Sequence, residues 1–411
     1  MELYQIENWI NNQEIAALNY EKVYDPGRLT DVVGLVAQAD EKDVDLAVKL
    51  ANDAFVHWKD MKVEVRSKLL LEAAECIEKN IKHYAALLTR ESGMLLALSI
   101  REIHSAIDVI KETVKLAEDF FIADRTQDDK TWIKIERVPL GVVAALTPWN
   151  APISAAINKV APIIITGNTV VVKPSPYAPI AISLILKEIA SLLPGGVVNV
   201  VNGDAKVGQI LTTHPFVRKV SLTGGNETAI QVMKSAANSL KRVHFELGGN
   251  DPAIILEDAN LYDAIPQIVE SAFRRSGQVC VATKRIYIPA SLYSRACELF
   301  VDYVANFKVG HGLQEEVTFG PVNNRDQFHY VKGIIERAKA YSTVKELGAK
   351  MEPDNWENGY YILPTIAMNV KENHEIVSCE QFGPVVPLIA YKNEAEAILM
   401  ANNSEYGLGS T

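Results

Sequence analysis

The chain has 411 residues with a net charge of −10, and 48% of its residues are hydrophobic. This length predicts two or three domains with sizeable cores, and the acidic balance argues against a general nucleic-acid binder, which would need a basic face. The N-terminus has no basic stretch followed by an apolar one, and prolines and polar residues interrupt the most apolar run, 151–172. We therefore expect a cytoplasmic protein with neither a signal peptide nor a membrane span.

Four cysteines stand at positions 76, 280, 297 and 379. None forms a Cys-x-x-Cys pair and no histidine pair at helical spacing lies beside one, so a zinc site is not expected. Structural disulfides are disfavoured in a reducing compartment.

The first third of the chain is predicted to be mostly helical. Apolar residues recur at helical spacing between positions 44 and 58, with Asp40 as the N-cap and Asp43 in the first turn. Two more helical stretches are expected at about 66–91 and 96–123. The segment 131–138, "TWIKIERV", alternates like a strand with one exposed face.

From Gly141 onward, β-rich runs alternate with helical runs. The β-rich runs are "GVVAALTP", "NTVVVKPSP", "GGVVNVVNG", "VRKVSLTGG" and "RVHFELGG". This alternation predicts an α/β fold with a Rossmann-like, doubly wound parallel sheet. Such sheets bind ligands at the carboxyl ends of their strands, where this chain places Thr147, Trp149, Asn150, Lys173, Gly224, Gly225 and Glu246. The pattern predicts a nucleotide-sized ligand.

The usual dinucleotide fingerprint is missing, because no G-x-G-x-x-G stands between a strand and a helix. "GDAKVG", which ends at Gly208, has only the outer glycines, and a plain turn explains them equally well.

A second α/β section begins after about Asn250. "DPAIILED" and "KRIYIPA" are predicted strands, 261–275 a helix, and "QFGPVVPLIAY" a loop followed by a strand. Cys280 falls on the loop between the helix and the second strand.

Each candidate residue has a structural alternative. Cys280 is a nucleophile or an inert buried thiol. Glu246 is a functional carboxyl or a strand-end carboxylate in water. Asn150 donates to an oxyanion or caps a turn or helix. Lys173 either contacts a ribose or phosphate of a ligand, or is an ordinary solvated lysine at a strand end. His244 is interpreted as a structural strand residue.

Taken in order, Asn150, Lys173, Glu246, Cys280 and the segment 380–384 resemble the aldehyde dehydrogenase superfamily. The matching stretches are "PLGVVAALTPWN", "GNTVVVKPS", "LTGG", "FELGG", "SGQVC" and "CEQFGPVVP". The resemblance covers nearly the whole chain. "ELGG" followed by "GQxC" at this interval is the most specific part.

The resemblance implies oxidation of an aldehyde to a carboxylic acid with NAD, NADP being possible. Cys280 matches the nucleophile, Asn150 with the Cys280 backbone N–H the oxyanion hole, and Glu246 the general base that activates water. Lys173 and Glu380 match the residues that hold the two riboses, and Phe382 the ring beside the nicotinamide. Further residues on the expected cofactor path are Thr147, Trp149, Ser175, Gly208, Gly224, Gly225 and Leu247.

The family also implies a domain plan. Residues 1–118 and 140–248 would bind NAD(P), 119–139 would form a small oligomerisation strand region, and 249–411 would form a C-terminally incomplete catalytic domain. The expected partners are a small aldehyde and, as in the full-length family, other copies of the chain in a homodimer or homotetramer, with neither nucleic acid nor membrane.

Four departures from the family pattern stand out. Pro176 replaces a glutamate that disfavours a 2′-phosphate, which leaves NADP use open. Gly225 replaces a serine, and Ala151 replaces an aromatic residue and should widen the substrate tunnel. The sequence stops at "EYGLGST", where family members continue for roughly 60 to 80 residues, so we expect exposed sheet edges and apolar surface.

Three functions remain open at this point. The first is a hydrolytic NAD(P)-dependent aldehyde dehydrogenase. The second is a CoA-acylating aldehyde dehydrogenase, against which the presence of Glu246 speaks. The third is an inactive relative with a structural or binding role, which the complete set of chemical residues argues against and the short C-terminus favours.

Overall fold

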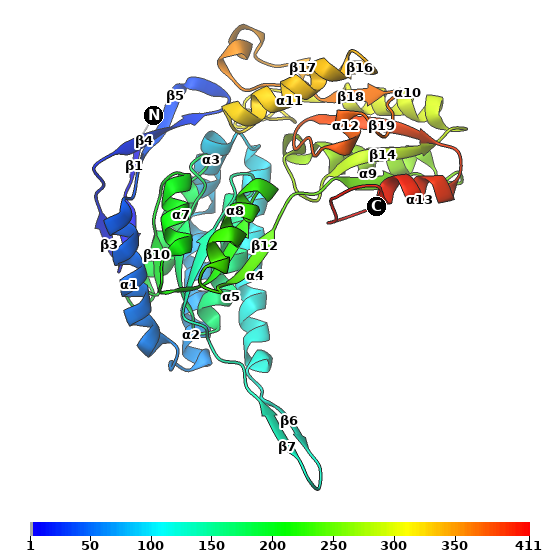
Figure 1. Ribbon diagram of the computed structural model, residues 1–411. Helices are drawn as coiled ribbons and strands as arrows, with labels where there is room; N and C mark the ends of the chain where they lie inside the picture. The colour runs from blue at the N-terminus through cyan, green and yellow to red at the C-terminus, as the bar shows by residue number, and fades with distance from the viewer. Residues whose placement is uncertain (1–2) are drawn as a thin grey trace. The chain divides into compact units, whose positions relative to one another are not determined.

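The computed structural model describes residues 3–411 (Figure 1). The chain forms two compact units. Unit 1 contains the residues up to Val23 together with 32–91 and 99–246, and unit 2 contains 24–31, 92–98 and 247–411. The strands β4 (Tyr20–Asp25) and β5 (Arg28–Ala37) carry the chain from unit 1 into unit 2 and back.

Unit 1 is built on a seven-stranded sheet with a parallel centre. Its parallel part has the order β12 (Arg242–Glu246), β11 (Val217–Thr223), β8 (Val142–Leu146), β9 (Thr169–Lys173) and β10 (Val198–Val200). Two antiparallel strands, β2 (Asn8–Ile10) and β3 (Gln13–Ile15), continue the sheet beyond β10. The predicted doubly wound parallel sheet is therefore confirmed, and the antiparallel edge is an addition that the sequence patterns did not indicate.

Helices cover both faces of this sheet. The helices α1 (Glu41–Trp58), α7 (Ala205–Thr213) and α8 (Asn226–Ala237) pack along one face, and α2 (Val63–Lys79), α5 (Pro152–Ile165) and α6 (Ile180–Ser191) along the other. All five residues of β8 and all five of β9 are buried, as expected for strands covered on both faces.

The N-terminal helices follow the sequence pattern with one correction. Asp40 caps α1, and its side chain and that of Asp43 form a reciprocal capping box. The single helix expected at 66–91 is in fact two, α2 and α3 (Ile81–Ser92), which are separated at Asn80. The Asn80 amide donates to the Cys76 carbonyl and to Glu188, so a side chain that competes for backbone groups marks the break.

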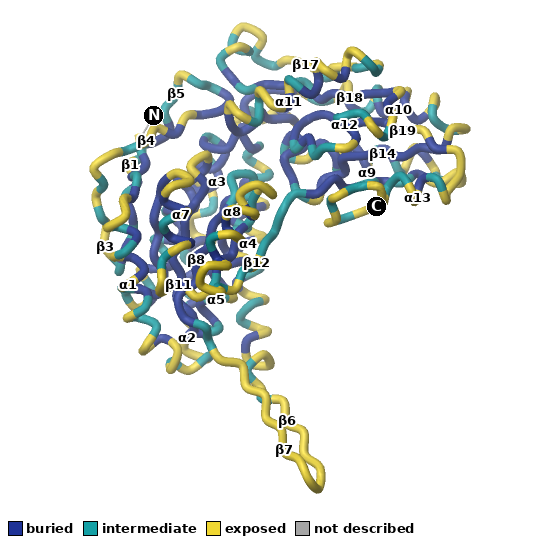
Figure 2. The backbone as a smooth tube through the Cα atoms, in the orientation of Figure 1, coloured by how far each residue is buried: buried dark blue, intermediate teal, exposed yellow. Residues whose placement is uncertain are grey.

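A long helix and a hairpin follow. The helix α4 (Leu96–Phe120) leads into a two-stranded hairpin of β6 (Asp124–Gln127) and β7 (Trp132–Ile135). The expected strand in "TWIKIERV" exists, but the expectation of only one exposed face is wrong, because every residue of both strands is exposed (Figure 2). Among residues 3–411, no further strand pairs with this hairpin.

Unit 2 contains a five-stranded sheet. Its order is β13 (Asp251–Ile254), β14 (Thr283–Pro289), β19 (Val385–Tyr391), β18 (Thr365–Met368) and β16 (Thr343–Glu346), of which only β16 is antiparallel to its neighbour. The backbone of Thr411 pairs with β13 at Pro252 and Ile254, so this edge of the sheet is partly covered.

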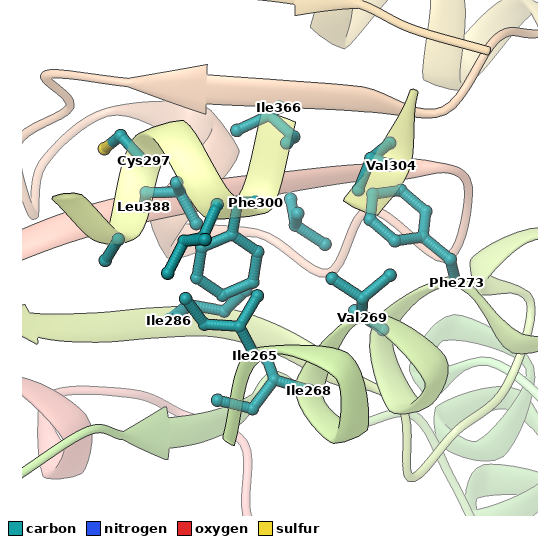
Figure 3. Close-up of a cluster of buried hydrophobic side chains, with 14 of the residues drawn as sticks. Ile265, Ile268, Val269, Phe273, Ile286, Cys297, Phe300, Val304, Ile366 and Leu388 are labelled. Atoms are coloured by element: carbon teal, nitrogen blue, oxygen red, sulfur yellow. The ribbon is translucent and has the colours of Figure 1, made fainter. Parts of the chain in front are cut away.

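The remaining elements of unit 2 surround this sheet. They are α9 (Leu261–Phe273), α10 (Tyr293–Val304), α11 (Arg325–Ala338), α12 (Glu375–Ser378), α13 (Glu394–Asn402), the short strands β15 (Lys308–Val309) and β17 (Ala349–Lys350), and the 3-10 turns 274–277 and 353–358. Ile265, Phe273, Ile286, Phe300 and Leu388 meet in one apolar core between α9, α10 and the sheet (Figure 3). Among residues 3–411, no helix is long and apolar enough to cross a membrane.

Candidate active site

In unit 1, the predicted residues lie where the parallel strands end. Lys173 and Glu246 are the last residues of β9 and β12, and Asn150 follows β8 by a few positions. Backbone hydrogen bonds tie these ends together, since Thr147 N donates to Lys173 O at 3.2 Å and Gly224 N donates to Glu246 O at 3.0 Å. The carboxyl ends of parallel strands share one edge of a sheet, which is the usual ligand edge of this architecture.

The same edge has the features that a dinucleotide needs. The Thr147 hydroxyl is buried and has no hydrogen-bond partner among the described residues, although a buried polar group normally finds one. A Cβ atom added at Gly225 would meet no atom within 4 Å, so backbone is open to a ligand beside the N-terminus of α8. The residues present therefore fit NAD(P), with an unused donor and a glycine pair at a helix N-terminus.

Lys173 is a buried cation at this edge. Its ammonium donates to the Pro174 carbonyl at 3.1 Å, and its stem lies 3.5 Å from where a side chain on Gly208 would begin. Burial lowers the pKa of Lys173 to about 8, and the charge of Asp204 opposes this shift. Ser175, also buried, accepts from the Tyr177 backbone N–H at 3.4 Å. The predicted ribose-binding residue is thus held inside the unit rather than solvated.

Asn150 and Trp149 are placed by the helix that follows them. The N-cap position of α5 is Ala151, whose side chain offers no acceptor. Glu102 of α4 supplies it instead, since its buried carboxylate accepts from Ile153 N at 3.0 Å and Ser154 N at 3.2 Å. A carboxylate at a helix N-terminus satisfies orphan donors and complements the helix dipole. The alternative of Asn150 as the cap of this helix is wrong, because the cap position is the next residue.

Glu246 lies on the edge strand of the sheet. The residues of β12 are half-buried or exposed, unlike the fully buried residues of β8 and β9. Glu246 pairs in register with Thr223 of β11. Glu246 interacts electrostatically with Lys159 of α5, whose pKa burial lowers to about 8 while the charge of Glu246 opposes the shift.

His244 lies on the same strand as predicted. Its Nδ1 atom is 3.5 Å from the Ser221 hydroxyl, which also accepts from Lys159 at 3.3 Å. Burial, together with the charges of Lys159 and Lys219, lowers the pKa of His244.

In unit 2, Cys280 lies on a loop with an unusual backbone. Arg275, Ser276 and Gly277 have positive φ angles of 52°, 56° and 73°. Left-handed conformations of non-glycine residues are costly and persist only where their surroundings fix them. Here the Ser276 hydroxyl donates to Gly320 O at 2.8 Å, and Gln278 accepts from Asn323 N at 2.9 Å.

A second segment of unit 2, residues 380–384, carries Glu380 and Phe382. Gly249 N donates to a Glu380 carboxylate oxygen at 3.1 Å, and Lys284 lies 3.5 Å from the same oxygen. Burial raises the pKa of Glu380, and Lys284 and the Gly249 N–H oppose that rise. Phe382 has a φ of 46°, and its carbonyl accepts from Gln327 at 2.9 Å.

The other three cysteines have ordinary surroundings. Cys297 is buried in the apolar core of unit 2 (Figure 3), and burial raises the pKa of its thiol, which makes it unreactive. Cys76 lies on α2 and Cys379 precedes Glu380. No disulfide joins the cysteines, and residues 3–411 contain no group of three or more His, Cys, Asp or Glu that would hold a metal ion.

The structure thus gathers the predicted residues in two sets. Unit 1 holds Asn150, Glu246 and the cofactor candidates Thr147, Trp149, Lys173, Ser175, Gly208, Gly224 and Gly225, and unit 2 holds Cys280, Leu247, Glu380 and Phe382. Sequence reasoning missed Glu102 and Lys284. Glu102 sits in the helical stretch expected at 96–123, where no local pattern sets it apart from the other acids, and Lys284 stands next to a second basic residue, a pattern typical of solvated surface.

Comparison with known proteins identifies the class of this chain. The model of the aldehyde dehydrogenase family matches residues 9–411. A 3,6-anhydro-alpha-L-galactose dehydrogenase of Vibrio sp. (strain EJY3) is 33% identical over 100% of this chain and 86% of its own length. An alpha-ketoglutaric semialdehyde dehydrogenase of Bacillus subtilis (strain 168) is 32% identical over 98% of this chain and 84% of its own.

Solved structures agree. A 3,6-anhydro-L-galactose dehydrogenase in complex with NAP superposes with a TM-score of 0.93 at 30% identity, over 99% of this chain and 86% of that one. The NAD+ complex of an aldehyde dehydrogenase from Bacillus cereus gives 0.94 at 30% identity, over 99% and 84%.

The chain belongs to the aldehyde dehydrogenase family. It is an oxidoreductase that oxidises aldehydes with NAD(P), as the sequence resemblance implied.

Proposed function

We propose that this enzyme is of the hydrolytic type, with Cys280 as nucleophile, Asn150 as oxyanion donor and Glu246 as general base. What supports the proposal is the family match over residues 9–411 together with the fixed environment of Cys280, whose loop adopts a costly backbone held by buried hydrogen bonds. Strained backbone at a reactive residue is typical of functional sites.

The reaction proceeds through two covalent adducts on Cys280. The thiolate sulfur attacks the aldehyde carbon, and the carbonyl oxygen becomes an oxyanion that accepts from the Asn150 amide and the Cys280 backbone N–H. Donors of this kind are each worth about 3 kcal/mol in comparable sites. When bound, NAD(P) supplies the acceptor for the hydride that leaves the adduct, and a thioester on Cys280 remains.

Glu246 completes the turnover. Its carboxylate takes a proton from water, the resulting hydroxyl attacks the thioester carbon, and the carbon–sulfur bond breaks to release the carboxylic acid and the thiolate. A retained general base favours water as the acyl acceptor over CoA.

We assign the cofactor to the carboxyl edge of the unit 1 sheet. Lys173 and Ser175 face a ribose, and Thr147, Trp149, Gly208, Gly224 and Gly225 line the path of the pyrophosphate and nicotinamide. In unit 2, we assign Leu247, Glu380 and Phe382 to binding of the same cofactor. Since Pro176 offers no carboxylate against a 2′-phosphate, both NAD and NADP are expected to serve.

A single set of assays tests the reaction type. The purified chain is given propionaldehyde with NAD or NADP, with and without CoA, and cofactor reduction and the acyl product are followed. Carboxylic acid formed at the same rate with and without CoA supports the hydrolytic type. An acyl-CoA product that depends on added CoA would refute it, and no reduction with any aldehyde, by a chain that is folded by circular dichroism, would favour an inactive relative.

The nucleophile is tested by Cys280→Ala. Turnover should fall below detection, while NAD binding measured by fluorescence titration stays within about twofold, because no cofactor contact is assigned to the sulfur. Cys76→Ala, on α2, is the matched control and should retain full turnover. Turnover retained by Cys280→Ala would refute the assignment.

We further propose that residues 119–139 join copies of this chain into a homodimer or homotetramer. The β6–β7 hairpin exposes Trp132, Ile133 and Ile135, at 62%, 49% and 57% of their surfaces, on both of its sides. A lone two-stranded hairpin is only marginally stable in water, so a partner surface would stabilise it. All four cysteines are free thiols, as is usual in a reducing compartment, which supports the cytoplasm as the place of action.

A further inference from the structure

Lys284 is a buried cation whose ammonium donates to three backbone carbonyls of the Cys280 loop. It is the second residue of β14, and its side chain is 3% exposed. Its ammonium donates to Cys280 O at 2.7 Å, to Val279 O at 3.0 Å and to Ala282 O at 3.3 Å. An ammonium has three N–H donors, and they are shared between these three carbonyls and Glu380, whose carboxylate lies 3.5 Å away.

The charge of this ammonium is only partly balanced by carboxylates. Glu380 approaches it at 3.5 Å, but that carboxylate also accepts from Gly249 N. Asp251 of β13 is the other facing acid, and burial raises the pKa of Asp251. Arg285 points elsewhere, to Asn250 O and the end of α13. A buried cation is costly unless nearby negative charge offsets it.

A thiolate on Cys280 would be a further negative charge, on a residue whose backbone carbonyl accepts from this ammonium at 2.7 Å. Burial lowers the pKa of Lys284, whereas Glu380, Asp251 and Cys280 each raise it. Electrostatic coupling between two groups is mutual, so the ammonium favours the thiolate as much as the thiolate favours the ammonium.

We propose that Lys284 is a positioning residue that holds the carbonyls of Val279, Cys280 and Ala282 and stabilises the thiolate form of Cys280, the form that reacts as a nucleophile. This inference rests on the proposed role of Cys280. A thiolate, not a thiol, attacks carbonyl carbons, and a nearby ammonium is a known means of forming one.

The test is the pH dependence of Cys280 alkylation in the full-length chain. Iodoacetamide is added between pH 5.5 and 10.5, and the modified Cys280 peptide is quantified by mass spectrometry, which separates it from the other three cysteines. In the wild type, the apparent pKa should lie below the ordinary thiol value of about 8.5. In Lys284→Met, alkylation at pH 7 should be about tenfold slower, while the rate at pH 10 stays within about threefold.

The shape of the profile separates this role from a purely structural one. If Lys284 only shapes the loop, Lys284→Met changes the rate by the same factor at every pH, and the proposal is overturned. Lys284→Arg keeps the charge and should retain a profile close to that of the wild type. If Lys284→Met does not fold, the wild type decides alone, because a thiol with an apparent pKa of about 8.5 or above contradicts the proposal.

The alkylation measurement does not depend on dehydrogenase turnover, so it tests the role of Lys284 separately from the proposed function. If Cys280→Ala retained dehydrogenase activity, the proposed function would fail, yet the alkylation profiles would still report whether Lys284 acts on the thiol.

Discussion

Gly277 shows how a single residue decides the shape of the Cys280 loop. Its φ is 73°, and a Cβ atom there would lie 2.1 Å from the Gly383 carbonyl oxygen. The close approach joins the loop before Cys280 to the segment that carries Phe382. No side chain fits between two backbones at that distance, so glycine is required for both its conformation and its size.

At this scale we predict that Gly277→Ala destabilises unit 2 and abolishes turnover. An alanine with positive φ and an overpacked contact together cost about 2 kcal/mol or more. Thermal unfolding followed by circular dichroism measures the loss. Gly407→Ala is the matched control, because a Cβ atom there meets nothing within 4 Å. Equal melting temperatures for Gly277→Ala and the wild type would show that the loop adapts.

At the scale of elements, two buried glutamates cap two helices of unit 1. Glu102 caps α5, and Glu91 of α3 caps α6 by accepting from Ile180 N at 2.6 Å and Ala181 N at 2.8 Å. Neither helix has a capping side chain at its own N-cap position. Glutamates from α3 and α4 therefore accept hydrogen bonds from the N-terminal N–H groups of the two helices that follow β8 and β9.

We predict that Glu102→Ala lowers kcat roughly tenfold, because the N-terminus of α5 shifts and Asn150, which directly precedes it, loses its alignment. The dissociation constant for NAD should change little, because Glu102 contacts the helix rather than the assigned cofactor groups. Glu102→Gln keeps an acceptor oxygen and should recover most of the activity. An unchanged kcat in Glu102→Ala would show that the position of Asn150 does not depend on this cap.

Because Glu91 is buried and titratable, we predict that the stability of the folded chain depends on pH. Burial raises the pKa of Glu91 to about 8 in the folded chain, against an ordinary value of 4.5. The charge of Glu102 adds to the shift, and the backbone N–H groups of Ala181 and Ile180 oppose it. A folded-state pKa above the unfolded one means that the folded chain binds more protons between these values. Stability from this group is therefore full below about pH 4.5 and decreases as the pH rises towards 8.

The comparison with Glu91→Gln isolates this effect. Between pH 6 and pH 8.5, the melting temperature of the wild type should fall further than that of Glu91→Gln, because glutamine does not titrate. Parallel curves for the two proteins over this range would contradict the raised pKa of Glu91.

At the scale of the whole molecule, the exposed β6–β7 hairpin predicts self-association. Ile133 and Ile135 are two positions apart on β7, so their side chains lie on the same side of the strand. The double variant Ile133→Lys, Ile135→Lys therefore places two like charges on that side. We expect this double variant to have a smaller mass than the wild type in sedimentation velocity. Leu18→Lys, at an exposed apolar residue elsewhere in unit 1, is the control and should leave the mass unchanged. A monomeric wild type, or an unchanged mass in the double variant, would refute the proposed interface.

Much of the fold was predictable because its signals are local. The central strands β8 and β9 of unit 1 are short runs of buried, mostly apolar residues, and the cap of α1 needs only Asp40 and Asp43. The break at Asn80 and the antiparallel edge strands were missed, because a short interruption and three-residue strands carry little periodicity. The family, the fold class and the use of NAD(P) followed from motifs at set spacings and are confirmed. The individual roles of Cys280, Glu246 and Asn150 stay predictions.

The sequence by itself determined that the central strands β8 and β9 are buried on both faces, which residues follow their carboxyl ends and to which family the chain belongs, since all three depend on residue type and order. Tertiary structure decided the partners of buried charges. Glu102 meets α5 and Lys284 meets the carbonyls around Cys280 only after distant segments pack together. Nothing in local sequence distinguishes such a glutamate or lysine from a solvated one, because the cost of burying a charge and the groups that offset it exist only in the folded chain.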